Sequence, residues 1–297
     1  MNKCTLSIDW EDFGQLYTKY HYKIDTPPLS AIIRQTDIIL DMLDETDRKA
    51  TFFILGLLAK YRPDLVKKIA AKGHEIAIHG QNHEILFTLN AKQIKEDIEE
   101  SIKTVSDITG TQIFGYRAPR FSINETNLYV LEILTELDLL YDSSIFPIKL
   151  PQYGILNFDK NDTLYKLHNQ KEIVEIPLST VKYFGKTFPV SGGGYVRLMP
   201  EMLVTSMFKK IRKEKRNSII YMHPYEFDTE SLDVTSNYPK DAQYSKIKTF
   251  ALNLRWNVSR NSVRKKVKQL LKEQEFITCL EKAHYVKNNT NSAKLLG

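Results

Sequence analysis

Residues 73–83 have the sequence GHEIAIHGQNH, which joins a short strand to two side chains able to bind a metal ion. The apolar run within it, residues 75–78, predicts a β-strand, and His79 and His83 follow directly. Two imidazoles are typical of a catalytic metal site, which needs a third protein ligand and an open position. In a chain with seven histidines such a pair also arises by chance on a solvated surface. Other candidate ligands near the pair are therefore needed to predict a metal site.

A second strand-like stretch, residues 4–8, ends at the acidic residues Asp9, Glu11 and Asp12. If the two stretches are neighbouring parallel strands, their C-terminal ends meet where α/β folds place active sites. Strand alternation puts Asp9 and Glu11 on the same face, with Asp12 already in the turn. The cluster therefore offers a carboxylate to complete the ligand set.

Helical and strand-like patterns alternate through the first half of the chain. Their short connections imply parallel strands joined by crossover helices, as in a barrel or a doubly wound sheet. The two common glycine-rich nucleotide-binding motifs are absent from the sequence, so a nucleotide site loses its main support. The patterns predict helices at 30–43, 63–71, 90–109 and 126–137, and strands at 50–55, 113–116 and 139–141.

The alternation of helices and strands stops at residues 150–200. There, residues 173–176 and 189–191 predict strands, and Gly192–Gly194 predicts a tight loop. Residues 218–222 predict a strong strand that ends at His223. An amphipathic basic helix over 263–271 and a final short strand over 276–280 follow. We expect one domain over 1–297, with 150–200 as a strand and loop insertion and 260–297 as a C-terminal helical extension.

Composition excludes several classes of protein. The net charge of +6 on 297 residues is mild, and no basic array is interleaved with aromatic residues, so we expect no nucleic-acid partner. The longest apolar stretch falls short of the ~18–20 residues that span a bilayer. No signal peptide is visible, and Cys4 and Cys279 are interpreted as reduced thiols, which favours the cytoplasm, including the inner face of the membrane. The oligomeric state is not indicated.

Other strand ends carry the remaining groups that hydrolysis needs, namely a base for the attacking water and an acid for the leaving group. Asp9 and His223 are available for these two tasks. Arg117, at the end of another strand, would keep Asp9 ionised and oriented, because a nearby cation favours the charged carboxylate.

The ordered motifs SIDWED, HGQNH, RAPRF, YDSS and IIYMHP resemble the polysaccharide deacetylases of carbohydrate esterase family 4, the NodB-like domain. The resemblance covers about residues 3–225. It implies an α/β fold, a distorted (β/α) barrel of about seven strands. It also implies a divalent metal, with Zn²⁺ the expected ion, and hydrolysis of acetyl groups from amino sugars.

The resemblance also assigns roles. The metal would be bound by His79, His83 and a carboxylate of the first motif. The family often has two adjacent carboxylates there, so both Glu11 and Asp12 stay open, and we favour Asp12 because a short carboxylate on a turn fits the usual arrangement. Asp9 would be the general base, Arg117 the cation that orients it, and His223 the general acid. The Arg120 N–H would donate to the oxyanion. Apart from the resemblance, the Tyr225 ring is a candidate to stack on a sugar, although an aromatic residue at a strand end also packs in a core.

The expected substrate is an acetylated sugar of a bacterial surface polysaccharide or of its precursor. Two alternatives follow from the same residues. One is an amide or imide hydrolase acting on a small cyclic substrate, and the other is an inactive glycan-binding domain.

Overall fold

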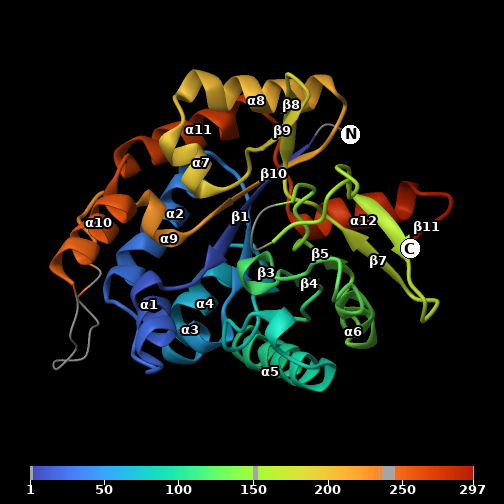
Figure 1. The fold of residues 1–297 in the computed structure, drawn as a ribbon, viewed down its shortest axis with the longest axis horizontal. Helices are drawn as coiled ribbons and strands as arrows, with labels where there is room; N and C mark the ends of the chain where they lie inside the picture. Colours follow the sequence, from blue (N-terminus) through green and yellow to red (C-terminus); the bar gives the residue numbers. More distant parts are fainter. Residues whose placement is uncertain (1–2, 150–152, 234, 236–244, 297) are drawn as a thin grey trace.

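A computed structural model describes residues 3–149, 153–233, 235 and 245–296 of the chain. Its centre is a sheet with the strand order β10-β1-β2-β3-β4-β5-β7-β6-β11 among the described residues (Figure 1). The strands are β1 (Cys4–Trp10), β2 (Thr51–Ile54), β3 (Glu75–Ile78), β4 (Gly115–Tyr116), β5 (Tyr141–Asp142), β6 (Thr163–Lys166), β7 (Glu172–Glu175), β10 (Ser218–Met222) and β11 (Lys294–Leu295).

The run from β10 to β7 is parallel throughout, and β6 pairs with β7 in the antiparallel sense. Between β7 and β10 the ring is completed by side-chain and backbone bonds: the Ile219 N–H donates to Ser179 Oγ at 2.8 Å, and the Tyr221 N–H donates to Ser191 O at 2.8 Å. The predicted fold class, a distorted (β/α) barrel of about seven strands, is confirmed.

The four predicted crossover helices are present; two of them closely match the predicted bounds, whereas the one predicted over 126–137 begins only at Val130 and the one predicted over 30–43 runs to Glu45. Pro63 opens α4 (Pro63–Ala71) at a position where its missing N–H costs nothing, and Gly73 follows it at φ 74°. Asn90 caps α5 (Ala91–Thr109) through a capping box with Gln93, and Gly110 ends it in the left-handed region. The other predicted helices are α2 (Ala31–Glu45) and α6 (Val130–Glu136).

The prediction of a final strand over residues 276–280 is wrong. Phe276 makes an isolated bridge to Cys4, but Thr278 then caps α12 (Cys279–Asn289) through a capping box with Glu281. The cap satisfies two backbone N–H groups of the first turn, which outweighs the β-propensity of this β-branched and aromatic stretch.

The predicted strand at 189–191 lies slightly earlier, in β9 (Lys186–Pro189), which forms a hairpin with β8 (Thr180–Tyr183). Strands β6, β8 and β11 were not predicted from the sequence, and neither were several helices and turns. These helices and turns are α1 (Phe13–Tyr22), α3 (Gly56–Tyr61), α7 (Gly193–Leu198), α8 (Glu201–Lys213), α9 (Pro224–Phe227), α10 (Lys246–Asn257) and the 3-10 turns at Leu86–Thr88, Pro119–Phe121 and Arg260–Ser262.

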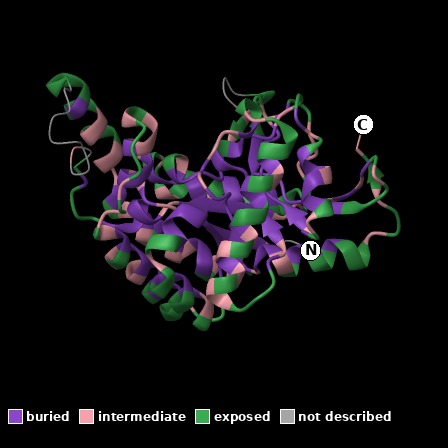
Figure 2. Ribbon diagram, turned by 90° about the horizontal axis from the view of Figure 1, so that it is seen from below, coloured by how far each residue is buried: buried purple, intermediate pink, exposed green. Residues whose placement is uncertain are grey.

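The central strands β1, β2 and β10 are buried on both faces, and Figure 2 shows the buried strands in purple in the middle of the molecule. Helix α11 (Val263–Glu273) buries Val263, Val267, Leu270 and Leu271 in the same core, as its amphipathic pattern predicts. Among the described residues, no helix is both long and apolar enough to cross a bilayer.

Candidate active site

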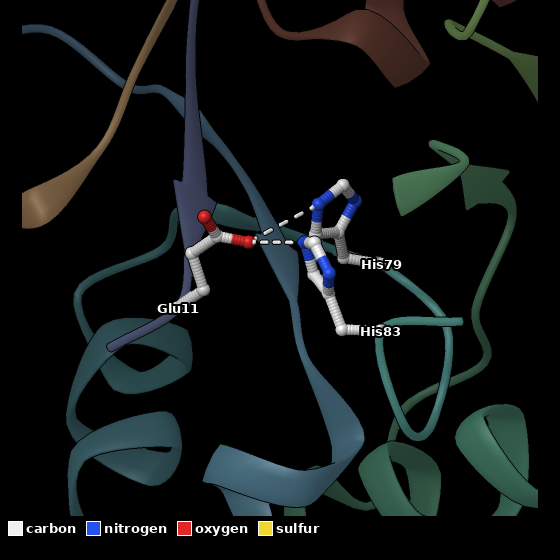
Figure 3. A group of neighbouring side chains, drawn as sticks. All are labelled: Glu11, His79 and His83. Carbon is white, nitrogen blue, oxygen red and sulfur yellow. Dashed lines mark ion pairs between the residues drawn. The ribbon is translucent and has the colours of Figure 1, made fainter. Parts of the chain in front are cut away.

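Three side chains converge beyond the C-terminal ends of β1 and β3 (Figure 3). Glu11 Oε2 lies 2.8 Å from His83 Nε2 and 3.4 Å from His79 Nε2. The chain between the two histidines is tightly bent, with Gly80 at φ 72° and His83 at φ 55°. These angles bring two side chains four residues apart onto one carboxylate.

The outer nitrogens of the two imidazoles are bound by other groups. His79 Nδ1 lies 2.8 Å from the Arg117 carbonyl oxygen, which accepts only, so Nδ1 is the donor, and in a neutral imidazole Nε2 then carries the lone pair. His83 Nδ1 contacts the Tyr20 hydroxyl, which itself donates to the His83 carbonyl at 2.6 Å, so this nitrogen is also the donor. Two lone pairs and a carboxylate then face one another, an arrangement that a cation between them satisfies.

The structure groups Glu11, and not the favoured Asp12, with the two histidines. Asp12 is the N-cap of α1: its Oδ1 accepts from the Gln15 N–H at 2.7 Å and the Leu29 N–H at 3.2 Å. Burial, with the charge of Glu11, raises the pKa of Asp12 to about 6. The geometry therefore favours Glu11, the alternative left open above, over Asp12 as the third ligand, since the helix cap already uses the carboxylate of Asp12.

Asp9 and Arg117 form a buried ion pair beside this cluster. Arg117 Nη1 lies 2.5 Å from Asp9 Oδ1, and its other donors bind Ser7 Oγ and both oxygens of Ser143, each at 2.9 Å. The guanidinium also lies 4.0 Å from the ring centre of Phe53. Because these contacts fix the orientation of the guanidinium, Arg117 holds the Asp9 carboxylate in one orientation.

His223 lies on the opposite side of Glu11, with Nε2 3.6 Å from Glu11 Oε1. Glu226 Oε2 accepts from the His223 backbone N–H at 2.9 Å and lies 3.3 Å from Nδ1. Burial alone would lower the pKa of His223, but the hydrogen bond to Glu226 and the charge of Glu11 raise it to about 9. At 24% exposure, His223 is open to solvent, whereas His79 and His83 are not.

Comparison with known proteins agrees with this geometry. Residues 28–138 match the polysaccharide deacetylase family, and residues 143–283 match a domain of unknown function, DUF3473. Residues 28–138 are thus similar to the polysaccharide deacetylase family. A structure from Mycobacterium smegmatis, described as a polysaccharide deacetylase, superposes with a TM-score of 0.64 at 17% identity, covering 100% of this chain and 94% of that one.

Two curated relatives illustrate the similarity of the deacetylase region. The peptidoglycan-N-acetylmuramic acid deacetylase PdaA of Bacillus subtilis is 36% identical over 98 residues, 33% of this chain and 36% of its own length. A chitooligosaccharide deacetylase of Rhizobium leguminosarum bv. trifolii is 40% identical over 70 residues, 24% of this chain and 33% of its own length. The chain thus spans about a third of the length of these relatives.

Two further predicted residues of this deacetylase-family site lie beside its centre. Arg120 lies in the 3-10 turn after β4 with φ 53°, and its guanidinium is 5.8 Å from the Tyr20 ring centre. Tyr225 stacks on His223 with ring centres 5.7 Å apart. Because Tyr225 is only 7% exposed, its ring supports His223 and offers little surface to a sugar.

Sequence reasoning missed three residues that hold the deacetylase-family site in shape. Tyr20 binds His83, Glu226 binds His223, and Asp97 on α5 accepts from the Gln81 and Asn82 N–H groups at 2.9 and 3.1 Å. For Glu226 the sequence held a signal, because His223-Pro224-x-Glu226 has the spacing of a capping box with proline at the first helical position.

Proposed function

We propose that this chain is a metal-dependent hydrolase that removes acetyl groups from an N-acetylated sugar of a polysaccharide or of its precursor. The observation that carries the proposal is the meeting of Glu11, His79 and His83 beside the ion-paired Asp9 and the solvent-open His223. The names of the two curated relatives, which act on peptidoglycan and chitooligosaccharide, support a glycan substrate.

A divalent ion, expected to be Zn²⁺, would be held by Glu11, His79 and His83, and would polarise the amide carbonyl and acidify a water molecule. Asp9 would take the proton of the attacking water, and the ion pair with Arg117 would hold this carboxylate in place. His223, oriented by Glu226, would give a proton to the amine nitrogen as the carbon–nitrogen bond breaks. The Arg120 N–H is the proposed donor to the tetrahedral oxyanion.

The test combines metal analysis with acetate release from acetylated chitooligosaccharides. We expect the purified protein to bind a divalent metal and to release acetate, and a chelator to stop the reaction until metal is restored. His79→Ala should lose both metal and activity. His168→Ala, at an exposed histidine remote in sequence from the motifs, is the matched control and should keep both.

The variant Asp9→Asn distinguishes the role of the general base from the role of the metal ligands. It should retain the metal and lower kcat by about 10²–10⁴-fold, the usual contribution of a general base. Acetate release by a metal-free protein would contradict the proposal. Turnover of a cyclic amide or imide without acetate release would favour the alternative hydrolase, and glycan binding without metal or turnover would favour an inactive binding domain.

A further inference from the structure

Helix α10 carries an apolar stripe that the rest of the described structure leaves exposed. Ile247, Phe250, Leu254 and Val258 recur at helical spacing, and their exposed fractions are 82%, 71%, 60% and 39%. Within the helix only Thr249 is buried. Figure 1 shows α10 in orange at the edge of the molecule. An apolar stripe of this length on a single surface helix marks a contact with something else.

Helix α10 itself carries only positive charge around this stripe, while the exposed Asp233 carboxylate beside it accepts from Asn253 at 3.3 Å. Helix α10 holds Lys246, Lys248 and Arg255 and no acidic residue. The cations of α11 do not extend this surface, because Arg264 and Lys268 pair with Glu45, Lys265 pairs with Glu201, and Lys266 is buried. A helix that is apolar on one face and cationic around it has the pattern of an interfacial helix that lies on an anionic bilayer.

The C-terminal end of α10 is fixed beside the candidate active site. Trp256 packs against Phe13 and Tyr225, with ring centres 4.3 and 5.2 Å away, and Arg197 donates to the Trp256 carbonyl at 2.9 Å. Tyr225 in turn stacks on His223. Whatever surface α10 contacts is therefore next to the group that we propose as the general acid.

We propose that α10 is a membrane-docking helix, which lays its apolar stripe into the interface of an anionic lipid bilayer and brings the active site to that surface. Charge favours this occupant over a second copy of the chain. In a two-fold dimer the same face meets itself, so the cations of α10 would oppose one another without an acidic partner on the helix. Anionic headgroups supply the missing charge.

The test is flotation of the full chain with vesicles of phosphatidylcholine, with and without about 30% phosphatidylglycerol, a level that gives an anionic surface. We expect binding to the anionic vesicles, weaker binding at high salt, and little binding to the neutral ones. Slower hydrogen exchange over residues 246–257 in the presence of anionic vesicles would locate the contact on α10.

Two variants and their controls separate the apolar and cationic contributions. Ile247→Ser/Phe250→Ser/Leu254→Ser and Lys246→Gln/Lys248→Gln/Arg255→Gln should each weaken vesicle binding by about tenfold or more. Leu156→Ser/Phe184→Ser, which removes apolar residues exposed elsewhere, should bind as the wild type does. Circular dichroism and acetate release from a soluble oligosaccharide check that the variants fold.

Three results would overturn the proposal: no binding of the wild type to anionic vesicles, wild-type binding by both α10 variants, or a wild-type dimer that the apolar variant converts to a monomer. The last result would assign the stripe to a second copy. Because vesicle binding needs no substrate, its failure is distinct from a failure of the proposed hydrolase activity.

Discussion

Glu11 and Asp12 are neighbours in sequence but hold different positions in the fold. Glu11 faces the imidazoles, whereas Asp12 caps α1. Glu11→Ala should therefore lose bound metal, while Asp12→Ala should keep it and lose about 1 kcal/mol of stability through the missing cap. Metal content by mass spectrometry and thermal unfolding distinguish the two variants. Metal lost from Asp12→Ala but kept by Glu11→Ala would restore the preference for Asp12.

The choice between these carboxylates shows where sequence reasoning stops. Alternation along β1 does not reach Glu11, because the strand ends at Trp10 and the Glu11 N–H donates to the Asp9 carbonyl at 3.0 Å. The helix that begins at Phe13 was not predicted, so the need of its backbone N–H groups for a cap could not be weighed. A ligand preference at a strand end depends on the element that follows, and here that element was missing from the prediction.

A second residue-scale prediction concerns Glu175, whose carboxyl lies against that of Asp142 across β5 and β7. Burial, and then the charge of Asp142, raise the pKa of Glu175 well above its usual range. The folded protein therefore keeps this proton while the unfolded chain releases it above pH ~4.5. Since the folded state then binds more protons, stability falls as pH rises above that value.

Glu175→Gln imitates the protonated carboxyl, so it should flatten this decline between about pH 5 and 8. At pH 8 we expect the free energy of unfolding of the variant to exceed that of the wild type by ~1 kcal/mol or more, because each pKa unit between folded and unfolded states corresponds to about 1.4 kcal/mol. Urea unfolding at several pH values measures the effect. Glu172→Gln, at an exposed position of the same strand, is the control and should follow the wild-type pH dependence.

At the scale of elements, α5 holds the loop between the two histidines. The carboxylate of Asp97 accepts the Gln81 and Asn82 N–H groups, and a Cβ at Gly80 would come within 2.9 Å of Asp97 Oδ2. Asp97→Ala should loosen the loop and weaken metal binding by about 10–100-fold, as is usual for groups that orient ligands. Glu96→Ala, exposed on the same helix, is the control. Unchanged metal affinity in Asp97→Ala would show that the loop is held by other contacts.

The elements also divide into those that the sequence predicts and those that it does not. The strands and crossover helices of the first half were predicted from the spacing of their apolar residues, because each helix buries one face and each strand buries both. Pro63, Gly73, Asn90 and Gly110 also mark helix ends clearly. The strand prediction at residues 276–280 was wrong because it gave the β-branched and aromatic residues more weight than the capping box of Thr278 and Glu281. That box is a helix start signal present in the sequence.

At the scale of the whole molecule, the C-terminal region predicted as an extension contributes to the core. The Cys4 N–H donates to Glu275 O at 2.9 Å, and the buried Lys282 amine donates to Ser218 O at 2.9 Å. The first residues of β1 and β10 are therefore both hydrogen-bonded to the C-terminal region. Helix α11 buries four aliphatic side chains, each worth about 1.5–3 kcal/mol. Their sum is comparable with the ~5–15 kcal/mol that stabilises a whole domain.

Deletion of residues 260–297 should therefore abolish cooperative unfolding. Removal of these helices exposes the inner face of the barrel next to β1 and β10, the strands that carry Asp9 and lead to His223, so metal binding should be lost with the fold. Deletion of 294–297 is the matched control, because Lys294 and Leu295 are exposed, and it should shift the unfolding temperature by only a few degrees. Calorimetry and metal analysis measure both, and a truncated 1–259 chain that unfolds cooperatively and binds metal would show that the barrel is complete without its C-terminal helices.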